Sequence, residues 1–110
     1  MVVEVEAAIA GARVLWIAQR GEDAAAAFSN HINLHVNDIA RVVRSRSVER
    51  IVYKSGGEIR YLSARSKGGR GCTADALALT PADYANADLM ATLLPCVTTS
   101  RNPRVIIRTS

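Results

Sequence analysis

The sequence contains few aromatic residues and no long hydrophobic run. Among its 110 residues there are one Trp, one Phe and three Tyr. No stretch approaches the roughly 18 consecutive apolar residues of a membrane span. Residues 1–11 carry two acidic residues and no basic one, so a secretory signal is not expected either. The default expectation is therefore a cytoplasmic protein.

Sequence motifs for metals and nucleotides are also missing. Cys72 and Cys96 lack metal-ligand spacing, and we expect free thiols, with a disulfide as the alternative. His31 and His35 are four residues apart, the spacing of a helical metal pair, but no third ligand is evident. The phosphate-binding pattern G-x-x-x-x-G-K-[ST] occurs nowhere in the chain. We therefore expect no metal site.

Positive charge is concentrated in one part of the chain. The formal net charge is +4, but residues 41–70, hereafter the basic segment, hold nine basic and two acidic residues, a local net charge of +7. Such a segment indicates a polyanionic partner such as DNA or nucleotide phosphate, with a solvated basic surface as the alternative. Only Tyr53 and Tyr61 could stack on bases there, so any DNA binding should be electrostatic and independent of sequence.

The first half of the chain has the pattern of a strand and helix crossover. Residues 2–10 read as the end of an alanine-rich helix capped by Gly11, and the apolar run 14–18 indicates a strand buried in a parallel sheet. From Gly21 onward, apolar residues spaced by three and four predict one helix of about five turns. The residues of this apolar stripe are Ala24, Phe28, Ile32, His35, Ile39 and Val42.

The second half predicts a hairpin, two strands and a helix. Residues 50–54 and 58–62 are β-rich runs joined by a turn with two glycines, which is typical of a hairpin. The remaining elements are two strands and a helix that Pro95 ends: residues 76–79, 104–108 and 81–94.

These elements predict one small α/β domain. Its parallel sheet would contain the strands at Val14, Ala76 and Val105, with helices on its faces and the hairpin at one edge. We expect the strand at Val14 to be left as an unpaired edge with exposed apolar surface, and the chain to self-associate through it.

A glycine-rich loop lies within the basic segment. Residues 66–71 contain three glycines and two cations, so backbone N–H groups could surround a phosphate while Arg65, Lys67 or Arg70 neutralises its charge. The alternative is a basic surface loop with no ligand.

Residues 80–83 have the pattern of a helix start. Thr80 can cap the helix, Pro81 suits its first position, and Asp83 falls where the acid of a capping box reaches back. The alternative is that Asp83 acts as a ligand of a metal or a water.

Several segments along the chain match one set of family motifs. The segment Val14–Gln19 precedes a helix with an A-x-x-x-F pattern, residues 60–75 contain Ser-Ala-Arg-Ser and Gly-Arg-Gly, and residues 89–103 contain Leu-Leu-Pro and Arg-Asn-Pro. In this order they resemble the ATPase domain of bacteriophage terminase large subunits, the motors that package DNA.

The resemblance implies a P-loop NTPase-type sheet and a specific set of site positions. In the family, a lysine loop just upstream of the helix that residues 2–10 would continue holds the phosphates of ATP, and the Walker B aspartate holds Mg²⁺ through water. The Walker B aspartate and glutamate align with Thr80 and Pro81, which cannot replace carboxylates. The end of the closing strand, which couples hydrolysis to movement, aligns with Thr109 and Ser110. A nuclease domain follows in the family.

The resulting expectation is a remnant or fragment of a terminase ATPase domain, in a bacterial host cell, with no cofactor of its own. Terminase or portal subunits are the partners that the resemblance implies. One alternative is a small basic module that binds nucleic acid or inhibits a motor, and another is a structural fragment without activity.

Overall fold

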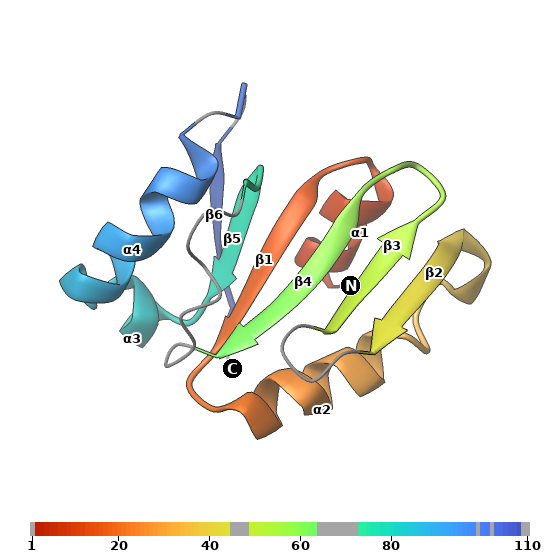
Figure 1. The fold of residues 1–110 in the computed structure, drawn as a ribbon, viewed down its shortest axis with the longest axis horizontal. Helices are drawn as coiled ribbons and strands as arrows, with labels where there is room; N and C mark the ends of the chain where they lie inside the picture. Colours follow the sequence, from red (N-terminus) through yellow and green to blue (C-terminus); the bar gives the residue numbers. More distant parts are fainter. Residues whose placement is uncertain (1, 45–48, 64–72, 99, 102, 109–110) are drawn as a thin grey trace.

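A six-stranded mixed sheet forms the centre of the protein (Figure 1). The computed structural model describes residues 2–44, 49–63, 73–98, 100–101 and 103–108. The strand order is β2-β3-β4-β1-β5-β6. Strands β4, β1, β5 and β6 are parallel, and β2, β3 and β4 are antiparallel. The strands are β1 (Arg13–Ala18), β2 (Ile39–Arg44), β3 (Glu49–Tyr53), β4 (Glu58–Ser63), β5 (Ala76–Leu79) and β6 (Arg104–Ile107).

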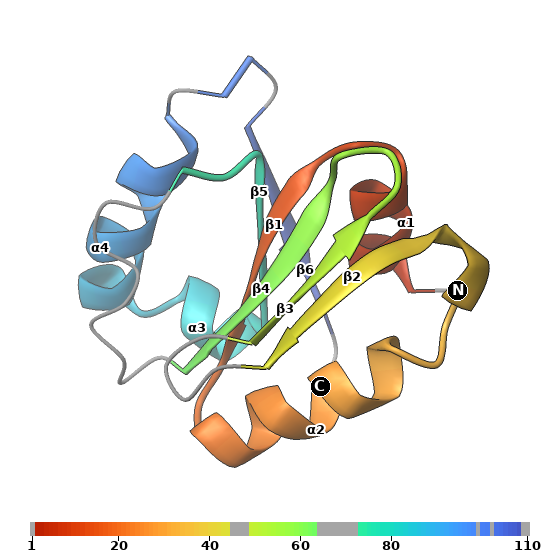
Figure 2. The ribbon, with the colours of Figure 1, turned by 45° about the vertical axis from the view of Figure 1, so that its right-hand side comes forward.

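Helices cover the two faces of the sheet unequally (Figure 2). On the first face, α1 (Val3–Ile9) and α2 (Gly21–His31) bury a cluster around Trp16, Phe28 and Tyr61. On the second face, α4 (Ala87–Val97) packs against Leu15 and Leu77. The short elements are α3 (Pro81–Tyr84) and the 3-10 helix η1 (Val36–Asp38). None of the helices in the described ranges is long and apolar enough to cross a membrane.

The predictions based on local signals are largely confirmed. Helix α1 ends before Gly11, whose φ of +111° is readily adopted only by glycine. Strand β1 is buried and parallel to both neighbours. The predicted hairpin is β3-β4, and Gly56 at its turn has a φ of +95°. The parallel order β1-β5-β6 also agrees with the sequence.

The prediction of a five-turn helix after Gly21 is wrong. Helix α2 ends at His31, and residues 39–44 form the edge strand β2. After α2 the chain turns, and His35 in this turn adopts a left-handed φ of +49°. Ile39 and Val42 could satisfy a helical spacing, but the β-branched run there pairs with β3 instead.

The expected position of β1 at an unpaired edge is also wrong. Strand β1 lies in the sheet interior between β4 and β5, and Val14 to Ala18 are at most 6% exposed. The hairpin is likewise not at the edge, because β2 covers its outer strand. Self-association through β1 therefore loses its structural basis, and the two edge strands are β2 and β6.

The single helix predicted after Pro81 is divided into two. Helix α3 ends at Tyr84, and Asn86 caps α4 by accepting a hydrogen bond from the Leu89 amide at 3.1 Å. Pro95 lies inside α4 rather than ending it. The cap at Asn86 thus starts a second helix, although the sequence pattern of residues 81–94 fits one continuous helix.

Candidate functional site at the carboxyl edge of the sheet

The parallel strands bring three distant segments together at one edge. Strands β1, β5 and β6 run in the same direction, and their carboxyl ends lead into Gln19, Thr80 and Arg108. Strand β4 ends at the same edge with Ser63. In open α/β sheets ligands bind outside the carboxyl ends of the strands, so this edge is the candidate site.

The segment after β5 starts a helix as the sequence predicts. Thr80 Oγ1 accepts a hydrogen bond from the Asp83 amide at 3.3 Å, and Pro81 occupies the first helical turn. The Asp83 carboxylate does not complete a capping box. Its Oδ1 accepts a hydrogen bond from Gln19 Nε2, at the end of β1, and its Oδ2 has no hydrogen-bond partner among the described residues.

Arg108 is a partly buried cation at this edge. Its guanidinium lies over the Trp16 ring, 3.7 Å from the ring centroid, and donates a hydrogen bond to the Ile17 carbonyl. Burial lowers the pKa of Arg108, although the nearby carboxylates of Glu4, Asp83 and Asp23 oppose that shift. A cavity of about 310 Å³ lies beside it, with Gln19, Asp23 and Thr80 among its lining residues.

The described residues of this edge include no carboxylate cluster of the kind that holds Mg²⁺ in phosphoryl transfer. Among the described residues there is no group of three His, Cys, Asp or Glu side chains that could hold a metal ion. Thr80 and Pro81 follow β5, and neither side chain can bind Mg²⁺ as a carboxylate does. Asp83 is fully buried, so it does not face the cavity.

Several predicted site residues lie outside the described residues. These are the glycine-loop cations Arg65, Lys67 and Arg70, with Cys72, and the coupling-motif residues Thr109 and Ser110. Their roles stay predictions. Cys96 is described, and its side chain is buried in α4; whether it is a thiol or part of a disulfide stays a prediction.

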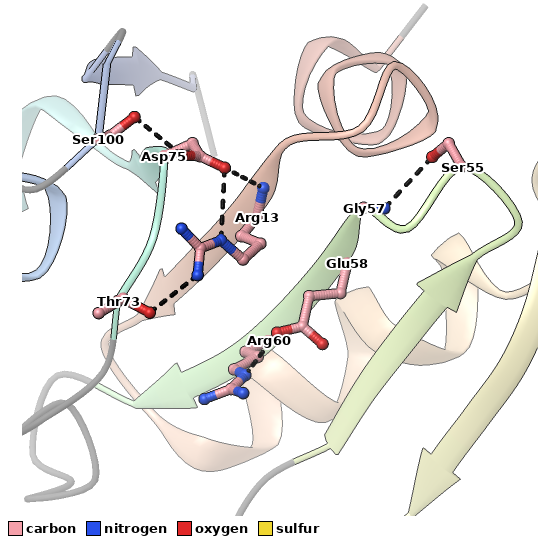
Figure 3. Close-up of polar contacts among 8 residues, drawn as sticks. All are labelled: Arg13, Ser55, Gly57, Glu58, Arg60, Thr73, Asp75 and Ser100. Atoms are coloured by element: carbon pink, nitrogen blue, oxygen red, sulfur yellow. Dashed lines mark hydrogen bonds and ion pairs between the residues drawn. The ribbon is translucent and has the colours of Figure 1, made fainter.

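A polar cluster that the sequence did not predict lies at the opposite, amino edge of the sheet (Figure 3). The Asp75 carboxylate accepts hydrogen bonds from the Arg13 amide at 2.9 Å and from Ser100 Oγ at 2.8 Å. Arg13 Nη1 donates to Thr73 Oγ1 at 2.9 Å. The hydrogen bond from the Arg13 amide is the main cause of the lowered pKa of Asp75, and the Ser100 hydrogen bond and the Arg13 charge add to this shift. The cluster ties the starts of β1 and β5 to the loop before β6, which is a structural role.

A second unpredicted cluster is buried on the first face of the sheet. His31 Nδ1 lies 2.6 Å from the Tyr61 hydroxyl, and His31 Nε2 lies 3.8 Å from Glu4 Oε1. His35 lies elsewhere, about half exposed, with its Nε2 3.6 Å from Glu6. The two histidines therefore do not form a metal pair, because His35 follows the end of α2.

His31 should make the stability of the protein depend on pH. Burial lowers its pKa below 6.5, with Arg108 adding to this shift and Glu4 opposing it. Between the lowered folded value and 6.5 the unfolded chain binds more protons, so the free energy of unfolding should fall as pH falls through this range. In urea denaturation between pH 4.5 and 7.5, His31→Gln should show a weaker decrease than the wild type. Parallel curves would contradict this expectation.

Comparisons with known proteins add no assignment. No protein-family model, no curated protein and no solved structure matches the chain significantly. The function must therefore be argued from the residues and from their placement in the fold.

Proposed function

We propose that the chain is a remnant or fragment of a terminase large subunit ATPase domain that cannot hydrolyse ATP by itself. The supporting observation is the convergence of three motif segments that are far apart in the sequence. Gln19 ends the first resembled segment, Thr80 stands at the Walker B-like position, and Arg108 lies in the closing segment. All three lie at the carboxyl edge of adjacent parallel strands, where an ATPase binds its nucleotide.

The topology gives independent support. The crossover from β1 to β4 passes through α2, on the same face of the sheet as α1. Because such crossovers are almost always right-handed, a strand preceding α1 would approach β1 from the side opposite β4. That place is the outer edge of β6, which has no other strand beside it among the described residues. A phosphate-loop strand upstream of α1, as the resemblance implies, would fit there.

The chain as given should hydrolyse no ATP above background in a phosphate-release assay with Mg²⁺. The phosphate clamp and the Walker B-like carboxylates are missing together, and electrostatic stabilisation provides most of phosphoryl-transfer catalysis. Introducing Thr80→Asp and Pro81→Glu together should not restore turnover, because the lysine loop would still be absent. Magnesium-dependent turnover that Asp83→Asn abolishes would refute the proposal and identify Asp83 as a ligand.

A second candidate function, electrostatic binding of nucleic acid, is favoured by a group of arginines on one face of the sheet. Arg41 of β2 and Glu58 of β4 both pair with Val52 of β3, and Arg60 of β4 pairs with Arg50 of β3. These residues lie on the second face of the sheet, where α4 packs near β5. Glu58 Oε1 pairs with Arg60 at 2.9 Å, and Glu58 Oε2 with Arg50 at 3.6 Å. The three arginines on this face thus exceed the one carboxylate, which pairs with two of them, and the net positive charge suits a phosphate backbone.

DNA affinity, if present, should depend steeply on salt and be equal for unrelated sequences. Each cation that neutralises one phosphate contributes about one unit to the salt slope. The double variant Lys67→Ala, Arg70→Ala should lower the slope by about two units, and Arg41→Ala by about one, in fluorescence anisotropy titrations. Arg20→Ala is the matched control, since Arg20 pairs with Glu22 at 3.0 Å away from this face. Equal affinity at low and high salt would leave the basic segment as a solvated surface.

The two candidates differ in what they predict for assembly. A motor fragment should bind terminase or portal subunits, as the resemblance implies, whereas a basic module needs only nucleic acid. Sedimentation velocity would also show whether the chain self-associates.

A further inference from the structure

An open cavity of about 910 Å³ lies at the amino edge of the sheet, opposite the candidate site. The starts of β1 and β6, the carboxyl end of α1 and the segment before β5 meet around it. Its apolar lining is formed by Ala7, Ala10, Ala12 and Pro103, and its polar lining by Arg13, Asp75, Ser100, Arg101 and Arg104. A cavity of this size is large enough for a small organic ligand.

Asp75 is the one acidic residue among the described residues that line the cavity, and its charge is compensated within the fold. Its Oδ2 accepts a hydrogen bond from the Arg13 amide at 2.9 Å and lies 3.5 Å from Arg13 Nε. Its Oδ1 accepts a hydrogen bond from Ser100 Oγ at 2.8 Å (Figure 3). The Asp75 carboxylate therefore balances one of the three lining arginines, and the cavity keeps a net positive charge.

Arg101 and Arg104 carry this excess positive charge. Both residues are exposed, and within the described part of the chain neither guanidinium forms an ion pair or a hydrogen bond. Cations that line one cavity without a counter-ion attract an anion to it. A planar guanidinium presents paired N–H donors, which match the oxygen atoms of a phosphate or a carboxylate group.

The carboxyl end of α1 is the feature of this cavity that opposes an anion, because the last carbonyl groups of a helix carry partial negative charge. Two of these groups are already hydrogen-bonded within the fold. The Ala7 carbonyl accepts from the Ala12 amide at 3.0 Å, and the Ala8 carbonyl accepts from the Gly11 amide at 3.0 Å. The arginines carry full charges, so they set the sign of the local field.

We propose that this cavity binds a small phosphate monoester. Its phosphate group accepts hydrogen bonds from Arg101 and Arg104, and its organic group lies against Ala10 and Pro103. A phosphate monoester fits two free arginines better than a carboxylate does, because it places nearly two negative charges and three acceptor oxygens in one group at neutral pH. The inference is independent of the proposed ATPase origin, because the nucleotide of an ATPase binds at the opposite edge of the sheet.

The test is isothermal titration calorimetry of the intact chain with phenyl phosphate, at neutral pH and low ionic strength. We expect half-saturation at about 1 mM, reasonable for a ligand of this size held by exposed arginines. Phenyl sulfate has nearly the same shape but a single negative charge, and it should bind at least about 10-fold more weakly. Equal affinity for the two compounds, or no binding of phenyl phosphate, would overturn the proposal.

Three variants and one control locate the site. Arg101→Gln and Arg104→Gln should each weaken phenyl phosphate binding at least about 5-fold, and because both side chains are exposed the fold should be unaffected. Arg41→Gln is the matched control, since it removes the same charge from the exposed face of β2, at the far side of the sheet, and should leave the affinity unchanged. Ala10→Leu should weaken binding by narrowing the cavity while it keeps every arginine. Unchanged binding by Arg101→Gln, Arg104→Gln or Ala10→Leu, or an equal loss in Arg41→Gln, would contradict the proposed site.

Discussion

Gly57→Ala is expected to destabilise the protein by more than about 3 kcal/mol, toward the upper end of single-substitution effects. A Cβ at Gly57 would lie 1.9 Å from the Ala8 carbonyl oxygen and 2.8 Å from the Ala12 carbonyl oxygen. Both are backbone atoms, one in α1 and one in the turn before β1, so no side-chain rotation can relieve the clash. They also hold the turn, because Ser55 Oγ donates to the Ala8 oxygen at 3.1 Å and the Glu58 amide to the Ala12 oxygen at 3.1 Å.

Urea denaturation monitored by circular dichroism measures this effect. Gly56→Ala is the matched control: its Cβ would meet no atom within 4 Å, but its φ is +95°. It should therefore cost only about 1–2 kcal/mol, the price of a left-handed conformation. Equal stability of the two variants would mean that α1 and the β3-β4 turn separate without loss, and the packing of α1 on β4 would have to be revised.

Phe28→Ala is expected to cost about 3–5 kcal/mol, as is usual for removing a fully buried aromatic ring. Phe28 is 0% exposed and holds α2 on the sheet. Its ring meets Tyr61 edge to face, with the ring centroids 5.5 Å apart, and the Arg44 guanidinium lies 5.1 Å from its centroid. The substitution therefore removes contacts of α2 with β4 and β2 at once.

Phe28→Leu is the control, since it keeps most of the volume and should cost less than about half as much. Thermal unfolding by calorimetry measures both variants. A double-mutant cycle with Arg44→Ala should return a coupling of about 0.5–1 kcal/mol for the cation–π contact. If Phe28→Ala and Phe28→Leu unfolded at the same temperature, the ring would not be an anchor of α2.

The candidate site was only partly predictable from the sequence. The cap formed by Thr80 and Pro81 depends on neighbouring residues and was predicted correctly, but the Gln19 partner of Asp83 is 64 residues away. The Glu4–His31–Tyr61 cluster joins α1, α2 and β4, and no local pattern distinguishes such a histidine from one on a surface. The only signal of this cluster in the sequence was Glu4, a polar residue within an alanine-rich helix.

The sequence by itself determined the features whose physical cause is local. Gly11 and Gly56 have positive φ angles that other residues rarely adopt, and the apolar runs at β1 and β5 require burial in a parallel sheet. Only the tertiary structure decided the state of residues 32–44 and the position of β1. Ile39 and Val42 fit a helical spacing, but pairing with β3 selects a strand, in which Ile39 and Val43 are half-buried and Val42 is exposed. Likewise, β1 lies in the sheet interior because β4, more than 40 residues later, pairs with it in parallel, and such a choice depends on contacts that no local window contains.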